Sequence, residues 1–119
     1  MKISKLFFYY PIAVAIIGVI IHLFNTLQLF QLEVPQRNHA FMLAIDLLVA
    51  LGLLKRAAFG YWLAILLFIQ QSIMQPYWAY VNYLKGDGLF QLFVTSPIVI
   101  TALVVLILNK ELFIRLNKD

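Results

Sequence analysis

Three polar residues inside apolar segments are the groups in this sequence most able to do chemistry. Asp46 is the only acidic residue within such a segment, His22 is the only histidine well inside one, and Gln71 lies in a third. An ionisable side chain at membrane depth is costly, so it marks a functional site by default. An imidazole titrates near neutral pH, so a His–Asp pair could pass protons or hold a polar ligand. The same pair could instead be a buried contact that fixes helix packing.

Counting from the expected outer ends of the segments places these three groups at one depth. At a rise of about 1.5 Å per residue, His22, Asp46 and Gln71 lie roughly 12, 10 and 13 Å below the same surface. Other residues on the same helical faces lie near this depth. Together with the three polar residues, they predict a polar pocket in the outer half of the molecule. The candidate ligand-binding residues are His22, Asn25, Asp46, Gln71, Gln75 and Trp78.

The segments that carry these residues are long and apolar. Of the 119 residues, 64% are hydrophobic and 12% are charged, whereas soluble domains are about 45–50% apolar and about 25% charged. This composition argues against a water-soluble globular fold and against disorder. A spanning helix needs about 20 mostly apolar residues. The sequence therefore predicts one all-α domain over residues 1–119, with four transmembrane helices at about 6–30, 39–54, 57–80 and 90–109.

The basic residues predict how these spans are oriented. If the chain crosses four times, seven basic residues fall on one side and two on the other. The seven are Lys2, Lys5, Lys55, Arg56, Lys110, Arg115 and Lys118, and the two are Arg37 and Lys85. Because basic residues favour the cytoplasmic side, we expect an integral membrane four-helix bundle with both termini in the cytoplasm, in a bacterial inner (plasma) membrane. Basic residues at span ends give no support to a nucleic-acid partner.

Local patterns predict how the spans pack. The short turn at Lys55–Arg56 indicates an antiparallel hairpin of spans two and three. Glycine and alanine at the inner ends would allow close helix approach. On span four the expected inward face is Gln91, Thr95, Ile98 and Thr101 or Ala102. The tail, 110–119, keeps a helical pattern that would either lie on the membrane surface or extend span four.

The middle of the chain resembles a known family. The stretch MLAIDLLVALGLLKRAAFGYWLAILLF combines an acidic residue in span two, a Gly-Leu-Leu sequence, a basic turn and an aromatic-rich span three. In this it resembles the small DoxX-like membrane proteins. The resemblance implies a four-helix bundle with both ends inside. Some members of that family are subunits associated with quinone-linked oxidation, which implies a quinone as one candidate ligand.

Three functions fit these patterns. The first is an accessory subunit whose outer pocket binds a small ligand, a lipid or a quinone headgroup. The second is an oligomeric transporter or channel, although the inner half offers no polar line to continue a path. The third is a structural or assembly protein whose polar residues only join helices, with a membrane-protein partner or a second copy. Nothing indicates an enzyme, because no nucleophile–base motif or cofactor fingerprint occurs. The absence of cysteine excludes thiol redox chemistry and Cys-ligated metals, and the sequence identifies no cofactor.

Overall fold

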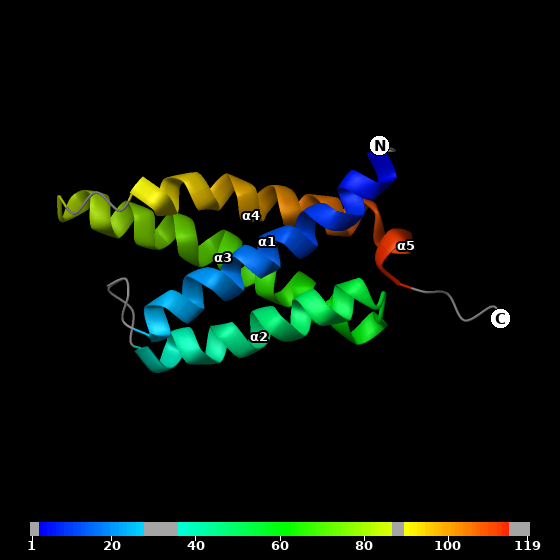
Figure 1. The fold of residues 1–119 in the computed structure, drawn as a ribbon. Coiled ribbons are helices and arrows are strands. Elements are labelled where there is room, and N and C mark those ends of the chain that lie inside the picture. The colour runs from blue at the N-terminus through cyan, green and yellow to red at the C-terminus, as the bar shows by residue number, and fades with distance from the viewer. Residues whose placement is uncertain (1–2, 28–35, 87–89, 115–119) are drawn as a thin grey trace.

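The fold consists of helices. The computed structural model describes residues 3–27, 36–86 and 90–114, and these contain no strand. The helices are α1 (Ile3–Thr26), α2 (Gln36–Leu54), α3 (Ala58–Leu84), α4 (Phe90–Leu108) and the short α5 (Lys110–Phe113) (Figure 1). The all-α class is therefore confirmed. The third predicted span ends too early, since α3 continues for one further turn beyond Tyr80, and residues 28–30 of the first lie outside the described residues.

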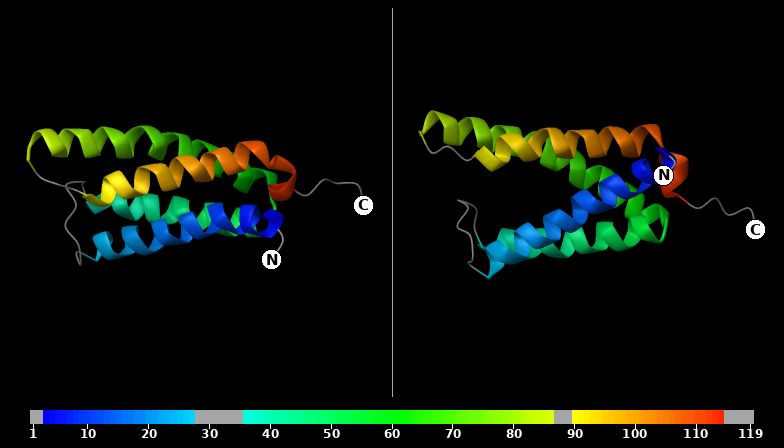
Figure 2. Two further views of the ribbon diagram at one scale, coloured as in Figure 1. Left: turned by 90° about the horizontal axis from the view of Figure 1, so that it is seen from above. Right: turned by 45° about the horizontal axis from the view of Figure 1, so that its top comes forward.

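The four long helices form two antiparallel hairpins. α1 packs mainly on α2, and α3 packs mainly on α4. The hairpins meet where the α2–α3 turn, the start of α1 and α5 lie, and they diverge toward the opposite end (Figures 1 and 2). We call the end with Lys55 and Arg56 the inner end, and the end with Lys85 the outer end. The elongated molecule measures 54 × 24 × 24 Å.

Two glycines bring α2 and α3 together at the inner end. A Cβ atom on Gly52 would lie 2.5 Å from the Cα of Gly60, and a Cβ on Gly60 would meet the backbone of Gly52 equally closely. Only residues without a side chain allow two helix backbones to approach so closely. The predicted antiparallel hairpin, with close approach at a small-residue inner end, is confirmed.

The turn between α2 and α3 uses an arginine where glycine is usual. The Arg56 N–H donates to Leu53 O and the Ala57 N–H donates to Gly52 O, each at 3.0 Å. This is the Schellman pattern of a helix C-terminus, in which the residue after the cap takes a left-handed conformation. Arg56 has φ of 54°, which costs a non-glycine residue about 1–2 kcal/mol. Hydrogen bonds of its guanidinium offset this conformational cost. Nε donates to Leu112 O and Nη2 donates to Glu111 O, both at 2.9 Å.

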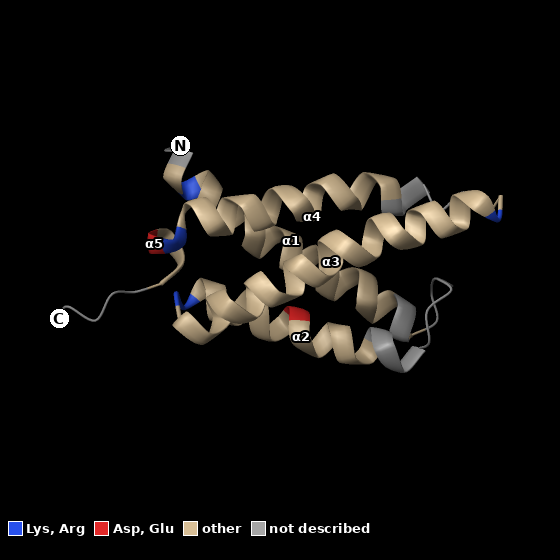
Figure 3. Ribbon diagram, turned by 180° about the vertical axis from the view of Figure 1, so that it is seen from behind, with Lys and Arg blue, Asp and Glu red and all other residues tan. Residues whose placement is uncertain are grey.

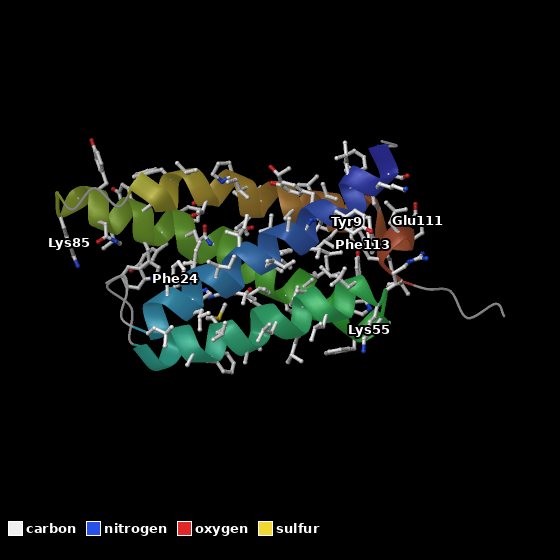
Figure 4. All side chains as sticks on the ribbon, viewed as in Figure 1. Tyr9, Phe24, Lys55, Lys85, Glu111 and Phe113 are labelled. Atoms are coloured by element: carbon white, nitrogen blue, oxygen red, sulfur yellow. The ribbon has the colours of Figure 1, made fainter. Side chains whose placement is uncertain are left out.

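These bonds hold α5 against the inner end. Phe113 is fully buried there. Its ring stacks on Phe8 at 5.5 Å and on Tyr61 at 6.4 Å between centroids, and the Tyr61 hydroxyl donates to Leu106 O at 3.0 Å. Figure 4 shows Phe113 together with Tyr9 and Glu111 at this end.

The expectation that the tail extends span four is wrong over the described residues 110–114. α4 ends at Leu108, and Asn109 leaves the helical conformation with φ of −127° and ψ of 40°. α5 then turns back onto the bundle instead of continuing α4 (Figure 1). The physical reason is the burial of the Phe113 ring against Phe8 and Tyr61, because an aromatic side chain buries a large apolar area.

Replacing Arg56 should release α5 and leave the turn in place. Arg56→Gly keeps the left-handed conformation, which glycine adopts freely, but removes both guanidinium bonds. We expect cleavage by chymotrypsin at Phe113 to become about ten-fold faster, which corresponds to about 1.4 kcal/mol of local opening free energy. Arg56→Lys is the matched control, since it keeps the charge without the forked geometry. Unchanged cleavage of Arg56→Gly would show that these bonds do not hold α5.

Two helices are long and apolar enough to span a membrane. They are Ser4–Phe24 within α1 and Ala58–Leu84, the whole of α3. Only 22% and 28% of the residues in their most apolar parts are buried, unlike the core helix of a water-soluble protein. The apolar parts of α2 and α4, Ala40–Leu54 and Phe93–Leu108, are shorter. Large apolar side chains are exposed along all four long helices, as at a surface that contacts apolar surroundings.

Charged side chains lie at the two ends of the molecule, with one exception (Figure 3). Lys5, Lys55, Arg56, Lys110 and Glu111 are at the inner end, and Lys85 is at the outer end. Among the residues that the structure describes, Asp46 is the only Lys, Arg, Asp or Glu between these ends.

Candidate polar site

The structure brings His22 of α1 and Asp46 of α2 together. His22 Nε2 lies 3.7 Å from Asp46 Oδ2. This distance suits an ion pair when the imidazole is protonated, and it exceeds the length of a direct hydrogen bond. The Asp46 side chain is 7% exposed and the His22 side chain 19% exposed. Asp46 is therefore the more buried member of the pair, and His22 is the more accessible one.

A glycine makes room for the carboxylate. A Cβ atom on Gly18 would lie 2.7 Å from Asp46 Oδ2 and 3.0 Å from its Cγ. Gly18 precedes His22 by four residues, so both lie on one face of α1. The carboxyl group of Asp46 therefore packs on bare backbone at Gly18 and faces the imidazole one turn further along. The sequence pattern did not identify this contact.

The glutamines of α3 form a separate chain of hydrogen bonds. Gln75 Nε2 donates to Gln71 Oε1 at 2.7 Å, and Gln71 Nε2 donates to Gln70 Oε1 at 2.6 Å. Gln70 is exposed, whereas Gln71 and Gln75 are half-buried. About two turns beyond Gln75, Asn82 is 2% exposed and its Nδ2 donates to Trp78 O at 2.7 Å. These amides bond within their own helix, as polar groups in an apolar environment require.

The predicted site residues thus fall on two different hairpins. His22 and Asp46 belong to the α1–α2 hairpin, and Gln71, Gln75 and Trp78 belong to the α3–α4 hairpin, which diverges from the first toward the outer end (Figure 1). Trp78 is half-buried. Asn25 lies near the end of α1, and its side chain is not among the side chains that the structure describes.

The expected inward face of span four is correct at Ala102 and wrong at Ile98. The buried residues of α4 are Ser96, Val99, Ala102 and Leu106. Two of the expected inward positions are exposed, namely Ile98 at 38% and Thr101. Ala102 is buried and Thr95 is half-buried. Thr101 need not face inward, because its hydroxyl donates to Pro97 O at 2.7 Å within the helix. Gln91 has no described side chain.

The described cavity lies away from the predicted pocket. It is a groove of about 440 Å³ between α1 and α4, toward the inner end. Its lining is almost wholly apolar and consists of Leu6, Phe7, Tyr9, Tyr10, Ala13, Thr101 and Val105. None of the predicted ligand-binding residues lines it. The Tyr10 hydroxyl ties the same two helices together, since it donates to Ile98 O at 2.9 Å.

Within the described part of the chain, no three His, Asp or Glu residues come together as metal ligands. Comparison with protein-family models, with curated proteins and with solved structures finds no match.

Proposed function

We propose that this chain is an integral membrane protein of four spans, with both termini in the cytoplasm, and that it binds a small ligand with a polar headgroup, a lipid or a quinone. It would act as an accessory subunit of a membrane complex. The observation that carries this proposal is the carboxylate–imidazole pair of Asp46 and His22, held between otherwise apolar helices at 3.7 Å. Such a pair is costly in an apolar environment, and the cost favours a functional reason for keeping it.

The charges support four spans, and the helix lengths allow them. The apolar parts of α2 and α4, Ala40–Leu54 and Phe93–Leu108, are about 22–24 Å long at 1.5 Å per residue, so they would cross a bilayer core of ~30 Å by thinning it locally. Four of the described basic side chains are at the inner end and one at the outer end, which supports a cytoplasmic inner end. α2 and α4 would cross with little tilt, and the 27-residue α3 would cross with more.

The chemistry of the pair suits a ligand with carbonyl or hydroxyl oxygens. Asp46 is the more buried partner, so it would orient the imidazole. The partly exposed ring of His22 would then donate a hydrogen bond to a quinone carbonyl or to a lipid headgroup oxygen. The half-buried Trp78 on the α3–α4 hairpin would supply an aromatic contact for the ligand.

A quinone titration tests this proposal. The protein has two tryptophans: Trp78 near the outer end and Trp62 at the inner end, where Lys110 Nζ lies 5.0 Å from its ring centroid. The purified protein in lipid nanodiscs is titrated with ubiquinone-1, and tryptophan fluorescence is recorded for Trp62→Phe and Trp78→Phe. In Trp62→Phe, which retains Trp78, we expect saturable quenching of the tryptophan fluorescence. In Trp78→Phe, which retains Trp62, we expect little quenching.

Asp46→Asn is the decisive variant in this titration. It keeps the shape of the side chain and removes the charge that orients His22, so we expect the affinity to fall at least about ten-fold, a loss of about 1.4 kcal/mol. Glu111→Gln is the matched control, because it makes the same acid-to-amide change at an exposed residue of the inner end, away from the pair. Equal affinity of Asp46→Asn and the parent would overturn a ligand site at this pair.

A further inference from the structure

A polar strip runs along one face of α3 in its outer half. Ser72, Gln75, Ala79 and Asn82 follow at intervals of three, four and three residues, so they share a face. Ala79 and Asn82 on this face are buried, at 1% and 2% exposure. α2 reaches α3 chiefly near the inner end, whereas α3 packs mainly on α4. The strip therefore lies in the α3–α4 interface.

Three oxygens on this strip are buried without a partner among the described residues. They are Ser72 Oγ, Gln75 Oε1 and Asn82 Oδ1. The Asn82 oxygen is identified by its amide partner, since Nδ2 donates to the Trp78 carbonyl and only the nitrogen is able to do so. A buried polar atom left without a hydrogen bond costs about 1–3 kcal/mol. Three such atoms on one face indicate that a further molecule supplies the hydrogen bonds.

Two prolines add carbonyl oxygens to the same region. Pro76 lies inside α3 and has no N–H, so the carbonyl of Ser72 loses its usual donor four residues ahead. Pro97 does the same on α4 for the carbonyl of Phe93. Near Ser72, its hydroxyl, its carbonyl and the Gln75 amide oxygen thus lie within about one helical turn. All are acceptors, and none carries a charge.

We propose that the outer half of the α3–α4 interface is a water inlet: bound water enters at Asn82 and reaches Ser72. Water supplies the donors that these oxygens require, and a buried water needs two to four polar partners such as the strip offers. Ordered water is also one way in which proline-interrupted membrane helices satisfy their freed carbonyls. Ser72 lies twelve residues before Leu84, where α3 ends, so the inlet would extend about 18 Å inward from the outer end.

The inlet does not depend on the proposed ligand at His22 and Asp46, because its polar atoms belong to the other hairpin. It does depend on α3 lying in lipid, since only there is water otherwise excluded. Its test therefore needs one position that reports on the strip and one that reports on the lipid-facing side of the same helix.

Cysteine labelling makes this comparison directly. The chain has no cysteine, so each introduced thiol is the only target for a charged, membrane-impermeant methanethiosulfonate. Ser72→Cys reports on the inlet, and it is nearly isosteric. Ile73 is 63% exposed, so Ile73→Cys reports on the lipid-facing side. Phe68→Cys lies one turn deeper on the strip face, and Lys85→Cys marks the outer end. The reagent is applied in sealed vesicles from the side at which Lys85→Cys reacts.

We expect Ser72→Cys to react within about ten-fold of the rate of Lys85→Cys, and Ile73→Cys and Phe68→Cys to react about a hundred-fold or more slowly, because the reagent needs a hydrated thiolate. Adding Asn82→Leu should slow Ser72→Cys about ten-fold, whereas Tyr83→Leu, its exposed neighbour, should not. Circular dichroism confirms that each variant is folded. Labelling of Ser72→Cys as slow as that of Ile73→Cys overturns the inlet. Fast labelling of Ile73→Cys also overturns it, and in addition contradicts the placement of α3 in lipid.

Discussion

Gly60→Val is expected to separate α2 from α3 at the inner end and to lower the free energy of unfolding by about 3 kcal/mol or more, at the upper end of overpacking effects. A Cβ atom at Gly60 would lie 2.5 Å from the carbonyl carbon of Gly52 and 3.0 Å from its oxygen. These atoms are backbone, so no flexible side chain is able to move aside. The two helices must separate, and their separation would also strain the Arg56 turn that follows Gly52.

The free energy is measured by unfolding in mixed micelles with increasing dodecyl sulfate, followed by far-ultraviolet circular dichroism. Ala58→Val is the matched control, since it adds the same β-branched side chain at an exposed position in the first turn of α3. We expect Ala58→Val to change the free energy of unfolding by less than about 0.5 kcal/mol. If Gly60→Val were as stable as Ala58→Val, the close approach of α2 and α3 would not exist in the folded protein.

Asp46→Leu is expected to destabilise the fold by about 2–3 kcal/mol, whereas the double variant His22→Leu/Asp46→Leu should recover most of that loss. Removing one member of a buried pair leaves the other without its partner, but replacing both by apolar residues is often neutral or stabilising. Leucine branches at the same carbon as aspartate, so it fits beside Gly18 with little change of shape. The pair would then not be needed for stability.

The same micelle unfolding assay measures this pair of variants. Ala44→Leu is the control for an added leucine on α2, because Ala44 is exposed. A double variant that is as unstable as Asp46→Leu would mean that the pair itself holds α1 against α2. That result would favour the structural interpretation of the polar residues over a ligand site.

The helical architecture could be predicted because it depends on local patterns. Long apolar runs, the basic turn and the small residues at the inner ends indicate helices and the α2–α3 hairpin without any tertiary information. α5 could not be predicted in this way. Its position depends on Arg56, whose guanidinium reaches carbonyls more than fifty residues away, and on the burial of Phe113 between Phe8 and Tyr61.

The His22–Asp46 pair could be anticipated from depth, because the helical rise converts residue counts into height. The inward face of α4 could not, since a threonine in a helix satisfies its hydroxyl on its own backbone and then faces either way. Ser72 and Gly18 were missed for a related reason. The role of Gly18 depends on the Asp46 carboxylate that lies against it, and that of Ser72 on the burial of its hydroxyl without a partner among the described residues.

The most direct test of the central claim is the ubiquinone-1 titration of the double variant His22→Leu/Asp46→Leu in nanodiscs, with Trp78 as the reporter. The claim is that this pair binds a ligand, so a folded double variant should show no saturable quenching at concentrations that saturate the parent protein. Saturable quenching of the double variant with the affinity of the parent would contradict it.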